Sequence, residues 1–273
     1  MLRRPVLVTG ANSGVGLETA LHLAELGFRA VVTARPEERA ESLAKAATEA
    51  GVEVETAVLD VAGAQACEEL VPRLDLWGLV NNAGYMNVGR LDDVPIEDAQ
   101  RQLEVMVVAP IRLVKLTLPS MRRRGEGRVV NVSSVTAHAT AAMTGWYEAC
   151  KHALSAVTDV LRREVADDGI DVVLIEPGGL NTGVADKAKD DLRRRRPGSV
   201  APSAYDRALT AVDTVRPFVG EPVAAARVIG EALTAGRPRA RYRVGADAPV
   251  VQLIQALVPE RVRDRLARVG VSE

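Results

Sequence analysis

The stretch Thr9-Gly10-Ala11-Asn12-Ser13-Gly14-Val15-Gly16 decides the fold of this chain. It follows the apolar run Val6-Leu7-Val8 and precedes a helical pattern that ends at Gly27, which predicts a buried strand, a tight glycine turn and a helix. Glycines at this spacing allow a sharp turn, close approach of the backbone to a pyrophosphate, and close packing of helix on strand. The helix N-terminus would direct free N–H groups and a positive dipole end at the phosphates. We therefore expect a dinucleotide site, with a plain turn as the alternative, and its contacts would come from Gly10, Ser13, Gly14, Val15 and Gly16.

Short apolar runs alternate with helical patterns along the rest of the chain. Strands are expected at residues 6–9, 30–33, 52–59, 76–80, 128–133 and 171–175, and helices at about 15–26, 37–50, 64–73, 96–124, 145–167 and 221–235. Continuous Val, Leu and Ile strands separated by helices imply a parallel sheet that is covered on both faces. The sequence thus predicts an α/β fold with a doubly wound parallel sheet.

Composition excludes several classes of protein. The chain has 273 residues, 47% of them hydrophobic, which suits one large domain over residues 1–273. A net charge of −1 gives no reason to expect nucleic acid or an anionic membrane as a partner. Cys67 and Cys150 are far apart and the three histidines are scattered, so no metal site is expected. We see no signal peptide and no run long enough to span a membrane, and we expect a cytoplasmic protein.

Residues 181–220 break the alternation of strands and helices. They are rich in Arg, Pro, Asp and Ala, and they follow the sixth expected strand, at the carboxyl edge where open parallel sheets bind ligands. We interpret them as a substrate-covering segment, and a disordered insertion is the alternative. The four arginines at 193–196 are expected to form a solvated helix face, because Asp186, Asp190 and Asp191 lie beside them.

Polar and small residues follow several expected strands, where such a fold places its chemistry. The run Asn81-Asn82-Ala83-Gly84 is small enough for a ribose to approach its backbone. Asp60, followed by Val61, ends the third strand, and its carboxylate is placed to accept a hydrogen bond from an adenine amino group. Ser133-Ser134 ends the fifth strand and Glu176-Pro177-Gly178-Gly179-Leu180-Asn181-Thr182 ends the sixth. For each of these alone, a structural turn is the alternative.

Tyr147 and Lys151 are four residues apart, which places both on one face of a helix. A free tyrosine has a pKa of roughly 10 and is a poor acid-base catalyst at neutral pH. A neighbouring ammonium favours the phenolate, so we expect it to lower the pKa of Tyr147. Ser134, 13 residues before the tyrosine, adds a hydroxyl that can hold a carbonyl or alcohol oxygen. The three residues predict a proton-transfer centre; a surface tyrosine and a solvated lysine are the alternative for the pair alone.

In combination, these motifs resemble the short-chain dehydrogenase/reductase family, in its compact branch, over about residues 5–235. The resemblance rests on Thr9-Gly10-(x)3-Gly14-x-Gly16, Asn81-Asn82-Ala83-Gly84, Ser134, Tyr147-(x)3-Lys151 and Pro177-Gly178. It implies a Rossmann-type fold and an oxidoreductase that interconverts a ketone or aldehyde and an alcohol with a nicotinamide cofactor.

The resemblance also implies roles for single residues. Tyr147 would be the general acid in reduction and the general base in oxidation. Lys151 would lower the pKa of the tyrosine and hold the nicotinamide ribose, and Ser134 would orient the reacting oxygen. Leu180 and Thr182 would contact the carboxamide or a phosphate. Further cofactor contacts would come from Asp60, Val61, Asn82, Ala83, Gly84, Tyr147 and Pro177.

One departure from the family pattern concerns Met106. Family members usually carry an asparagine there, which supports a kinked helix and a water in the proton relay to the lysine. A thioether cannot donate a hydrogen bond and accepts only weakly. The relay is therefore rebuilt through water, backbone or another polar group such as Gln102, or activity is reduced or lost. We favour a working enzyme, and the alternative is a nucleotide-binding regulator or low-activity pseudoenzyme.

The choice of cofactor depends on the end of the second strand. An NAD site needs an acid there for the ribose 2′-hydroxyl, but Ala34 occupies that place and Arg35 follows it. A guanidinium can pair with a 2′-phosphate in bidentate fashion. The sequence thus favours NADP over NAD, although Ser13 is not the basic residue that many NADP-dependent members carry.

The C-terminal part, about residues 237–273, is similar to the extension of hydroxysteroid and retinol dehydrogenase-like members. The similarity implies a strand at 242–244, giving about seven in all, and a tail that caps the substrate cleft; a subunit contact or plain packing is the alternative. We expect a lipophilic small-molecule substrate and a homodimer or homotetramer. His138 is expected to be an ordinary loop histidine, because nothing pairs with it in sequence. Candidate pocket residues are Tyr85, Met86, His138, Met143, Trp146 and Val184.

Overall fold

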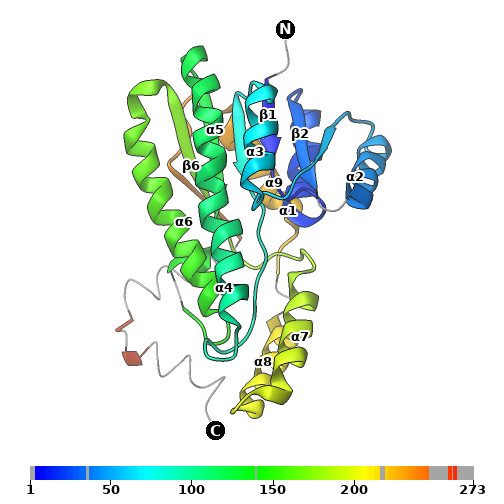
Figure 1. Ribbon diagram of the computed structural model, residues 1–273, viewed down its shortest axis with the longest axis vertical. Coiled ribbons are helices and arrows are strands. Elements are labelled where there is room, and N and C mark those ends of the chain that lie inside the picture. The colour runs from blue at the N-terminus through cyan, green and yellow to red at the C-terminus, as the bar shows by residue number, and fades with distance from the viewer. Residues whose placement is uncertain are drawn as a thin grey trace.

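A seven-stranded parallel sheet forms the centre of the computed structural model (Figure 1). The strand order is β3-β2-β1-β4-β5-β6-β7, and every neighbouring pair is parallel. The order reverses between β1 and β4, which places a ligand-binding crevice at the carboxyl ends of these strands. The predicted α/β fold and the edge strand at the C-terminal side are confirmed. The strands are β1 (Pro5–Val8), β2 (Arg29–Ala34), β3 (Glu55–Val58), β4 (Gly78–Asn81), β5 (Gly127–Val132), β6 (Ile170–Pro177) and β7 (Arg241–Val244).

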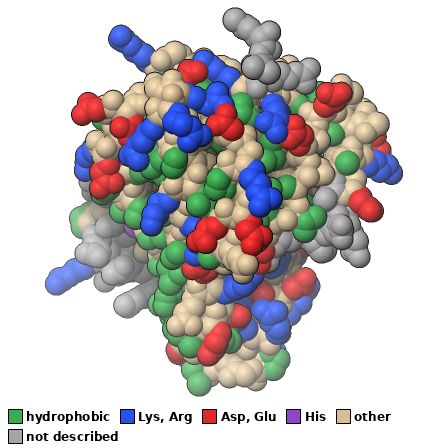
Figure 2. Space-filling view, turned by 45° about the horizontal axis from the view of Figure 1, so that its top comes forward, with side chains coloured by type: hydrophobic (Ala, Val, Ile, Leu, Met, Phe, Trp, Pro, Cys, Tyr) green, Lys and Arg blue, Asp and Glu red, His purple; other side chains and the backbone are tan. Residues whose placement is uncertain are grey.

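The structure describes residues 4–34, 37–138, 140–215, 219–245, 258–259 and 261–262, without the side chains of residues 37–40. Most of the predicted C-terminal tail lies outside these residues. None of the described helices is both long enough and apolar enough to cross a membrane. On the face shown in Figure 2, basic and acidic side chains are interspersed, as the near-zero net charge leads one to expect.

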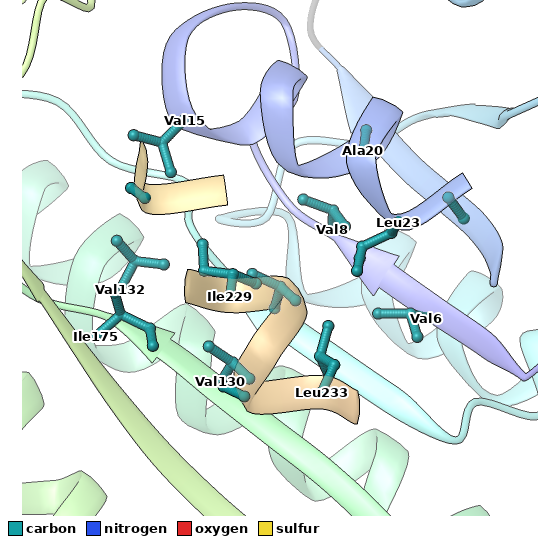
Figure 3. Close-up of a cluster of buried hydrophobic side chains, with 14 of the residues drawn as sticks. Val6, Val8, Val15, Ala20, Leu23, Val130, Val132, Ile175, Ile229 and Leu233 are labelled. Carbon is teal, nitrogen blue, oxygen red and sulfur yellow. The ribbon is translucent and has the colours of Figure 1, made fainter. Parts of the chain in front are cut away.

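Helices cover both faces of the sheet because alternate strand residues point to opposite sides. Val6 and Val8 of β1 enter one core, and Leu7 between them enters the other. The first core is covered by α1 (Gly14–Glu25), α2 (Glu37–Glu49) and α9 (Pro222–Thr234). Figure 3 shows Ile229 and Leu233 of α9 beside the strand residues of this core. The second core is covered by α3 (Ala64–Leu70), η1 (Val71–Leu74), α5 (Ala109–Arg124) and α6 (Gly145–Glu164).

The helix predicted at 96–124 is interrupted. Helix α4 (Ile96–Leu103) passes through a π-helical turn, η2 (Glu104–Val108), before α5 begins. Pro110 explains the interruption, because its ring lacks an N–H and clashes with the carbonyl four residues earlier in a regular α-helix. The N–H of Ala109 donates to the carbonyl of Glu104, five residues back, which is the π-helical pattern. The turn contains Met106, the residue at which we expect a departure from the pattern that the sequence resembles.

The segment 181–220 contains two helices, α7 (Val184–Arg195) and α8 (Pro202–Val215), joined by η5 (Arg196–Gly198). The disordered alternative is therefore wrong for its described part. The helices project from the lower end of the molecule in Figure 1. They form a small core of their own, in which Leu192 and Tyr205 are fully buried against Val88 and Met143.

Candidate active site

The glycine loop brings together three distant parts of the chain at the carboxyl edge of the sheet. Gly10 and Gly14 have φ of 67° and 56°, a region that favours glycine. A Cβ at Gly10 would lie 2.7 Å from the Cα of Ala83, and one at Gly14 would lie 2.9 Å from the Cβ of Thr182. At Gly16 it would lie 2.4 Å from the carbonyl oxygen of Gly10. The loop, the segment after β4 and the segment after β6 therefore meet, as the sequence predicts.

Asn82 and Thr9 hold this junction by hydrogen bonds. The Asn82 amide Nδ2 donates to the carbonyls of Thr9 and Gly10, at 2.9 and 3.1 Å. The Thr9 hydroxyl accepts from the backbone N–H groups of Asn82 and Ala83, both at 3.1 Å. The Asn82 side chain thus shapes the loop.

The start of α1 suits an anionic group. Ser13 is the N-cap, yet its side chain makes no capping hydrogen bond, and the first turn contains no acidic residue. The first N–H groups of α1 and the positive end of its dipole are therefore not neutralised by a neighbouring carboxylate. Together with the clash that any side chain would cause at Gly14 and Gly16, these residues fit the pyrophosphate of a dinucleotide.

The adenine side of the site is described in part. Arg35 lies outside the described residues, whereas Ala34 ends β2 and is buried. Asp60 has its Oδ1 3.0 Å from the N–H of Ala62 and its Oδ2 2.6 Å from Nη2 of Arg101. The predicted contact of Asp60 with adenine stays a prediction, and the pairing with Arg101 was not anticipated. Val61 is 5% exposed, so any contact to a cofactor would involve its backbone more than its side chain.

The three predicted catalytic residues meet between β5 and α6. Ser134 follows β5, is 8% exposed, and lies close enough to the Tyr147 hydroxyl to influence its pKa. Lys151 is 6% exposed and its Nζ lies 5.6 Å from the centre of the Tyr147 ring. The same Nζ donates to the carbonyl of Val132 at 2.8 Å. A phenol, a hydroxyl and an ammonium thus lie near one another.

Burial controls the proton affinities of this centre. It raises the pKa of Tyr147 to about 12, while the neighbouring Ser134 hydroxyl acts in the opposite direction. This direction is opposite to the lowered pKa expected from the sequence, because desolvation is the largest influence on the buried hydroxyl. Burial lowers the pKa of the Lys151 ammonium to about 8. At neutral pH the tyrosine is a protonated acid beside a charged lysine.

A buried chain of amides attaches α6 to the sheet. Asn81 Nδ2 on β4 donates to Asn131 Oδ1 on β5 at 2.8 Å, and to the carbonyl of Pro110 at 3.4 Å. Asn131 Nδ2 donates to the Thr158 hydroxyl on α6 at 2.8 Å. Asn81, Asn131 and Thr158 are all buried. Neither Asn131 nor Thr158 was predicted from the sequence, although an asparagine inside the apolar run 129–132 indicates a buried polar partner.

Met106 lies at the back of the site. It is 1% exposed, and a Cβ at Gly84 would lie 3.5 Å from its side chain. Gln102, one turn earlier and also buried, donates from Nε2 to the carbonyl of Tyr85 at 2.8 Å. Its Oε1 is buried and has no hydrogen-bond partner among the described residues. Gln102 therefore has one acceptor available to a bound water.

The α7–α8 hairpin is fixed to the segment after β4. Arg195 donates to the carbonyl of Val88 at 2.8 Å and pairs with Asp98 at 2.9 Å. The Tyr205 hydroxyl donates to Asp93 at 2.7 Å. Arg195 is 9% exposed, so the expectation of a solvated face for all of 193–196 is wrong at this position, while Arg193 and Arg194 are exposed. The buried guanidinium finds partners far away in sequence.

The candidate pocket residues divide between two surroundings. Met86 and Met143 pack on the small core of α7 and α8, whereas Tyr85 packs on the main core and has the Lys187 ammonium 4.7 Å from its ring centre. Met143 has φ of 74°, a left-handed conformation that strains a non-glycine residue. His138 has a partner that is distant in sequence: its Nε2 is 2.7 Å from Oε1 of the buried Glu176.

Within the part of the chain that the structure describes, no group of three or more His, Cys, Asp or Glu side chains could hold a metal ion. The two cysteines, Cys67 and Cys150, are buried free thiols. Burial raises the pKa of the Cys150 thiol to about 11, which keeps it protonated and unreactive at neutral pH.

Proteins similar to this chain are found both by sequence and by structure. Residues 4–193 match the sequence model of the short chain dehydrogenases. The chain is 30% identical to the uncharacterized oxidoreductase YbbO of Escherichia coli K12, over 97% of this chain and 94% of that protein. It is 31% identical to the NADPH-dependent 3-dehydrocapnine reductase of Ornithobacterium rhinotracheale, over 96% and 95%. The crystal structure of a single-substitution variant of actinorhodin polyketide ketoreductase with NADPH superimposes with a TM-score of 0.77, 28% identity, and coverage of 90% and 97%.

Proposed function

The chain belongs to the short chain dehydrogenase family, and from that premise we propose that it is an NADP-dependent oxidoreductase that interconverts a lipophilic ketone or aldehyde and its alcohol. The observation that carries the proposal is the contact of Ser134, Tyr147 and Lys151 at the edge of the sheet beside the glycine loop. Each of the three residues has a distinct role in the proposed reaction, and that role follows from the surroundings of its side chain.

In reduction, Tyr147 gives its phenolic proton to the substrate oxygen, which becomes the hydroxyl of the alcohol. Ser134 holds the same oxygen and orients the carbonyl. The Lys151 ammonium stabilises the phenolate that Tyr147 becomes. The nicotinamide, when bound, supplies the hydride that adds to the carbonyl carbon. A pKa of about 12 keeps Tyr147 protonated at neutral pH, which the role of acid requires.

Three observations support NADP as the cofactor. The end of β2 has Ala34 in place of an acid, and Arg35 follows it in sequence. The 3-dehydrocapnine reductase is described as NADPH-dependent, and the ketoreductase structure contains NADPH. Arg35 would pair with the 2′-phosphate, and Lys151 would hold the ribose.

The residues around the proposed cleft support an apolar substrate. Met86 and Met143 pack on the α7–α8 core, and thioether side chains adapt to apolar ligands of varied shape.

Part of the proposal is also a homodimer or homotetramer, which light scattering coupled to size-exclusion chromatography would establish.

The experiment mixes the protein and NADPH with a panel of aliphatic, aromatic and steroid-like ketones and aldehydes. Oxidation of NADPH is followed as a loss of absorbance at 340 nm. We expect turnover on at least one apolar carbonyl, a lower KM for NADPH than for NADH, and loss of that preference in Arg35→Asp. Ser134→Ala and Tyr147→Phe should each lower kcat by about 100-fold or more, since positioned proton transfer contributes that much.

A second candidate, a nucleotide-binding regulator without efficient chemistry, is favoured by one observation. The buried Met106 thioether stands where the family's asparagine supports the proton relay. Nucleotide binding without turnover on any member of the panel, unchanged by Tyr147→Phe, would support this alternative and contradict the enzyme.

A further inference from the structure

Glu176 is a buried carboxylate next to the candidate active site. It is 0% exposed, and its Oε1 accepts from His138 Nε2 at 2.7 Å and from Arg241 Nη1 at 2.6 Å. Its Oε2 lies 3.3 Å from Nε of Arg243. A carboxylate without water is costly unless cations and hydrogen-bond donors surround it. The three partners come from the turn after Ser134 and from β7, so Glu176 fastens both to the end of β6.

The hydrogen bond between His138 and Glu176 lies close to Ser134 in the chain. The β5–β6 ladder continues to the N–H of Ser133, which donates to the carbonyl of Ile175 at 2.8 Å. Beyond it the chain enters the short helix η3 (Val135–His138). Two hydrogen bonds among the described residues then join η3 and its leading serine to the end of β6. One is from the Ser134 hydroxyl to the carbonyl of Pro177, at 3.4 Å, and the other joins His138 and Glu176.

Only one of these two contacts is compatible with the proposed reaction. A serine hydroxyl has a single proton, so Ser134 cannot donate to Pro177 and to a substrate or tyrosine oxygen at once. The 3.4 Å separation is long for an O–H donor, which indicates that this contact is weak. When Ser134 turns to the reacting oxygen, the contact between His138 and Glu176 is the one that remains.

We propose that His138 is a positioning residue, which holds the turn that carries Ser134 in place through its hydrogen bond to Glu176. The proposal rests on the proposed function, because it assigns Ser134 to the reacting oxygen. Arg241 and Arg243 complete the arrangement by anchoring the same carboxylate from β7. The last strand of the sheet, and with it the start of the C-terminal extension, is thereby tied to the catalytic serine.

The test compares His138→Ala and His138→Gln with a matched control, His22→Ala. His22 on α1 also contacts a carboxylate, Glu25 at 3.2 Å, and its side chain is 24% exposed against 31% for His138. With the carbonyl that the panel identifies, we expect His138→Ala to lower kcat by roughly 10- to 100-fold, since a small misplacement has effects of that size. The Kd for NADPH and the Tm should stay close to those of His22→Ala.

Two further readouts separate positioning from a general structural effect. Gln places an N–H donor near the position of Nε2, so His138→Gln should recover kcat to within about threefold of the unsubstituted protein. The deuterium isotope effect on kcat with 4-deuterated NADPH should rise in His138→Ala, because hydride transfer then limits turnover. Equal kcat in His138→Ala and His22→Ala, or equal loss in the Ala and Gln variants, would overturn the proposal. If Ser134→Ala and Tyr147→Phe leave kcat unchanged, the proposed function itself fails, which is a distinguishable result.

Discussion

Lys151→Met should stabilise the nucleotide-free protein at neutral pH while it abolishes reduction. Lys151 is 6% exposed, and burial lowers the pKa of its ammonium from 10.5 to about 8. Since one pKa unit corresponds to about 1.4 kcal/mol, the folded state bears a cost of about 3 kcal/mol for holding this charge at pH 7. Methionine fills a similar volume without the charge.

The gain is reduced by the hydrogen bond that the lysine makes. Its Nζ donates to the carbonyl of Val132 at 2.8 Å, and the loss of such a contact costs about 1 kcal/mol. The net gain of about 2 kcal/mol should raise the Tm by roughly 4–6 °C in a chain of this size. Between pH 8 and 10.5 the unfolded state binds more protons at this site than the folded state, so the stability of the unsubstituted protein rises with pH and the advantage of Lys151→Met disappears.

Scanning calorimetry at pH 7 and near pH 10.5 measures this difference, with Lys115→Met as the matched control. Lys115 is exposed on α5, and its replacement should change the Tm little at either pH. If Lys151→Met melts below the unsubstituted protein at pH 7, or if its advantage persists near pH 10.5, the argument that burial of this charge is costly is wrong.

Particular contacts lead to four further predictions. Gly14→Ala should weaken NADPH binding by about tenfold or more. Gly27 is also at positive φ but has open space around it, so Gly27→Ala should lower only the Tm. Equal effects of the two variants on affinity in a fluorescence titration would contradict this. Met106→Asn should raise kcat by supplying the relay's donor, and an unchanged or lower rate measured well below the Tm counts against it. Arg195→Leu should destabilise the α7–α8 hairpin by about 3 kcal/mol, because the buried carbonyl of Val88 loses its donor and the buried Asp191 keeps only Arg194 as an ionic partner; unaltered hydrogen exchange in that hairpin would refute this. The kcat/KM for reduction should fall as pH rises through about 8, where Lys151 loses its proton while Tyr147 stays protonated, and a flat profile to pH 10 would exclude that role for the lysine.

The parts of the structure that the sequence predicts well depend on local chemistry. The strand, glycine turn and helix at residues 5–25 follow from apolar runs and from φ values that only glycine adopts easily. Tyr147 and Lys151 share a helix, so their spacing alone brings them to one face. Ser134 joins them because it ends a neighbouring strand of a parallel sheet.

The features that sequence reasoning missed depend on distant partners. His138 pairs with Glu176, 38 residues later, and Arg195 pairs with Asp98, 97 residues earlier. From the sequence, His138 had no visible partner, and Arg195 was assigned to a solvated helix face because acidic residues lie beside it in the chain. The hairpin of α7 and α8 was missed for a similar reason, since its few apolar residues are hidden among charges and are buried mainly by the segment after β4 and by Met143.

The direction of the Tyr147 pKa shift is a third example. The sequence shows that a lysine is nearby but not how deeply the tyrosine is buried, and in the structure burial is the largest influence on the pKa of Tyr147. In the proposed reaction, the tyrosine would therefore begin as an acid, and Lys151 would act on the phenolate only when it forms.

Single-turnover kinetics test the central claim, that Tyr147 transfers the proton, most directly. NADPH-loaded protein and Tyr147→Phe would each be mixed with excess carbonyl substrate in a stopped-flow spectrometer, and the absorbance at 340 nm followed. We expect equal affinity for NADPH in both proteins and a rate of oxidation at least about 100-fold lower in Tyr147→Phe. Equal rates in the two proteins would contradict the account.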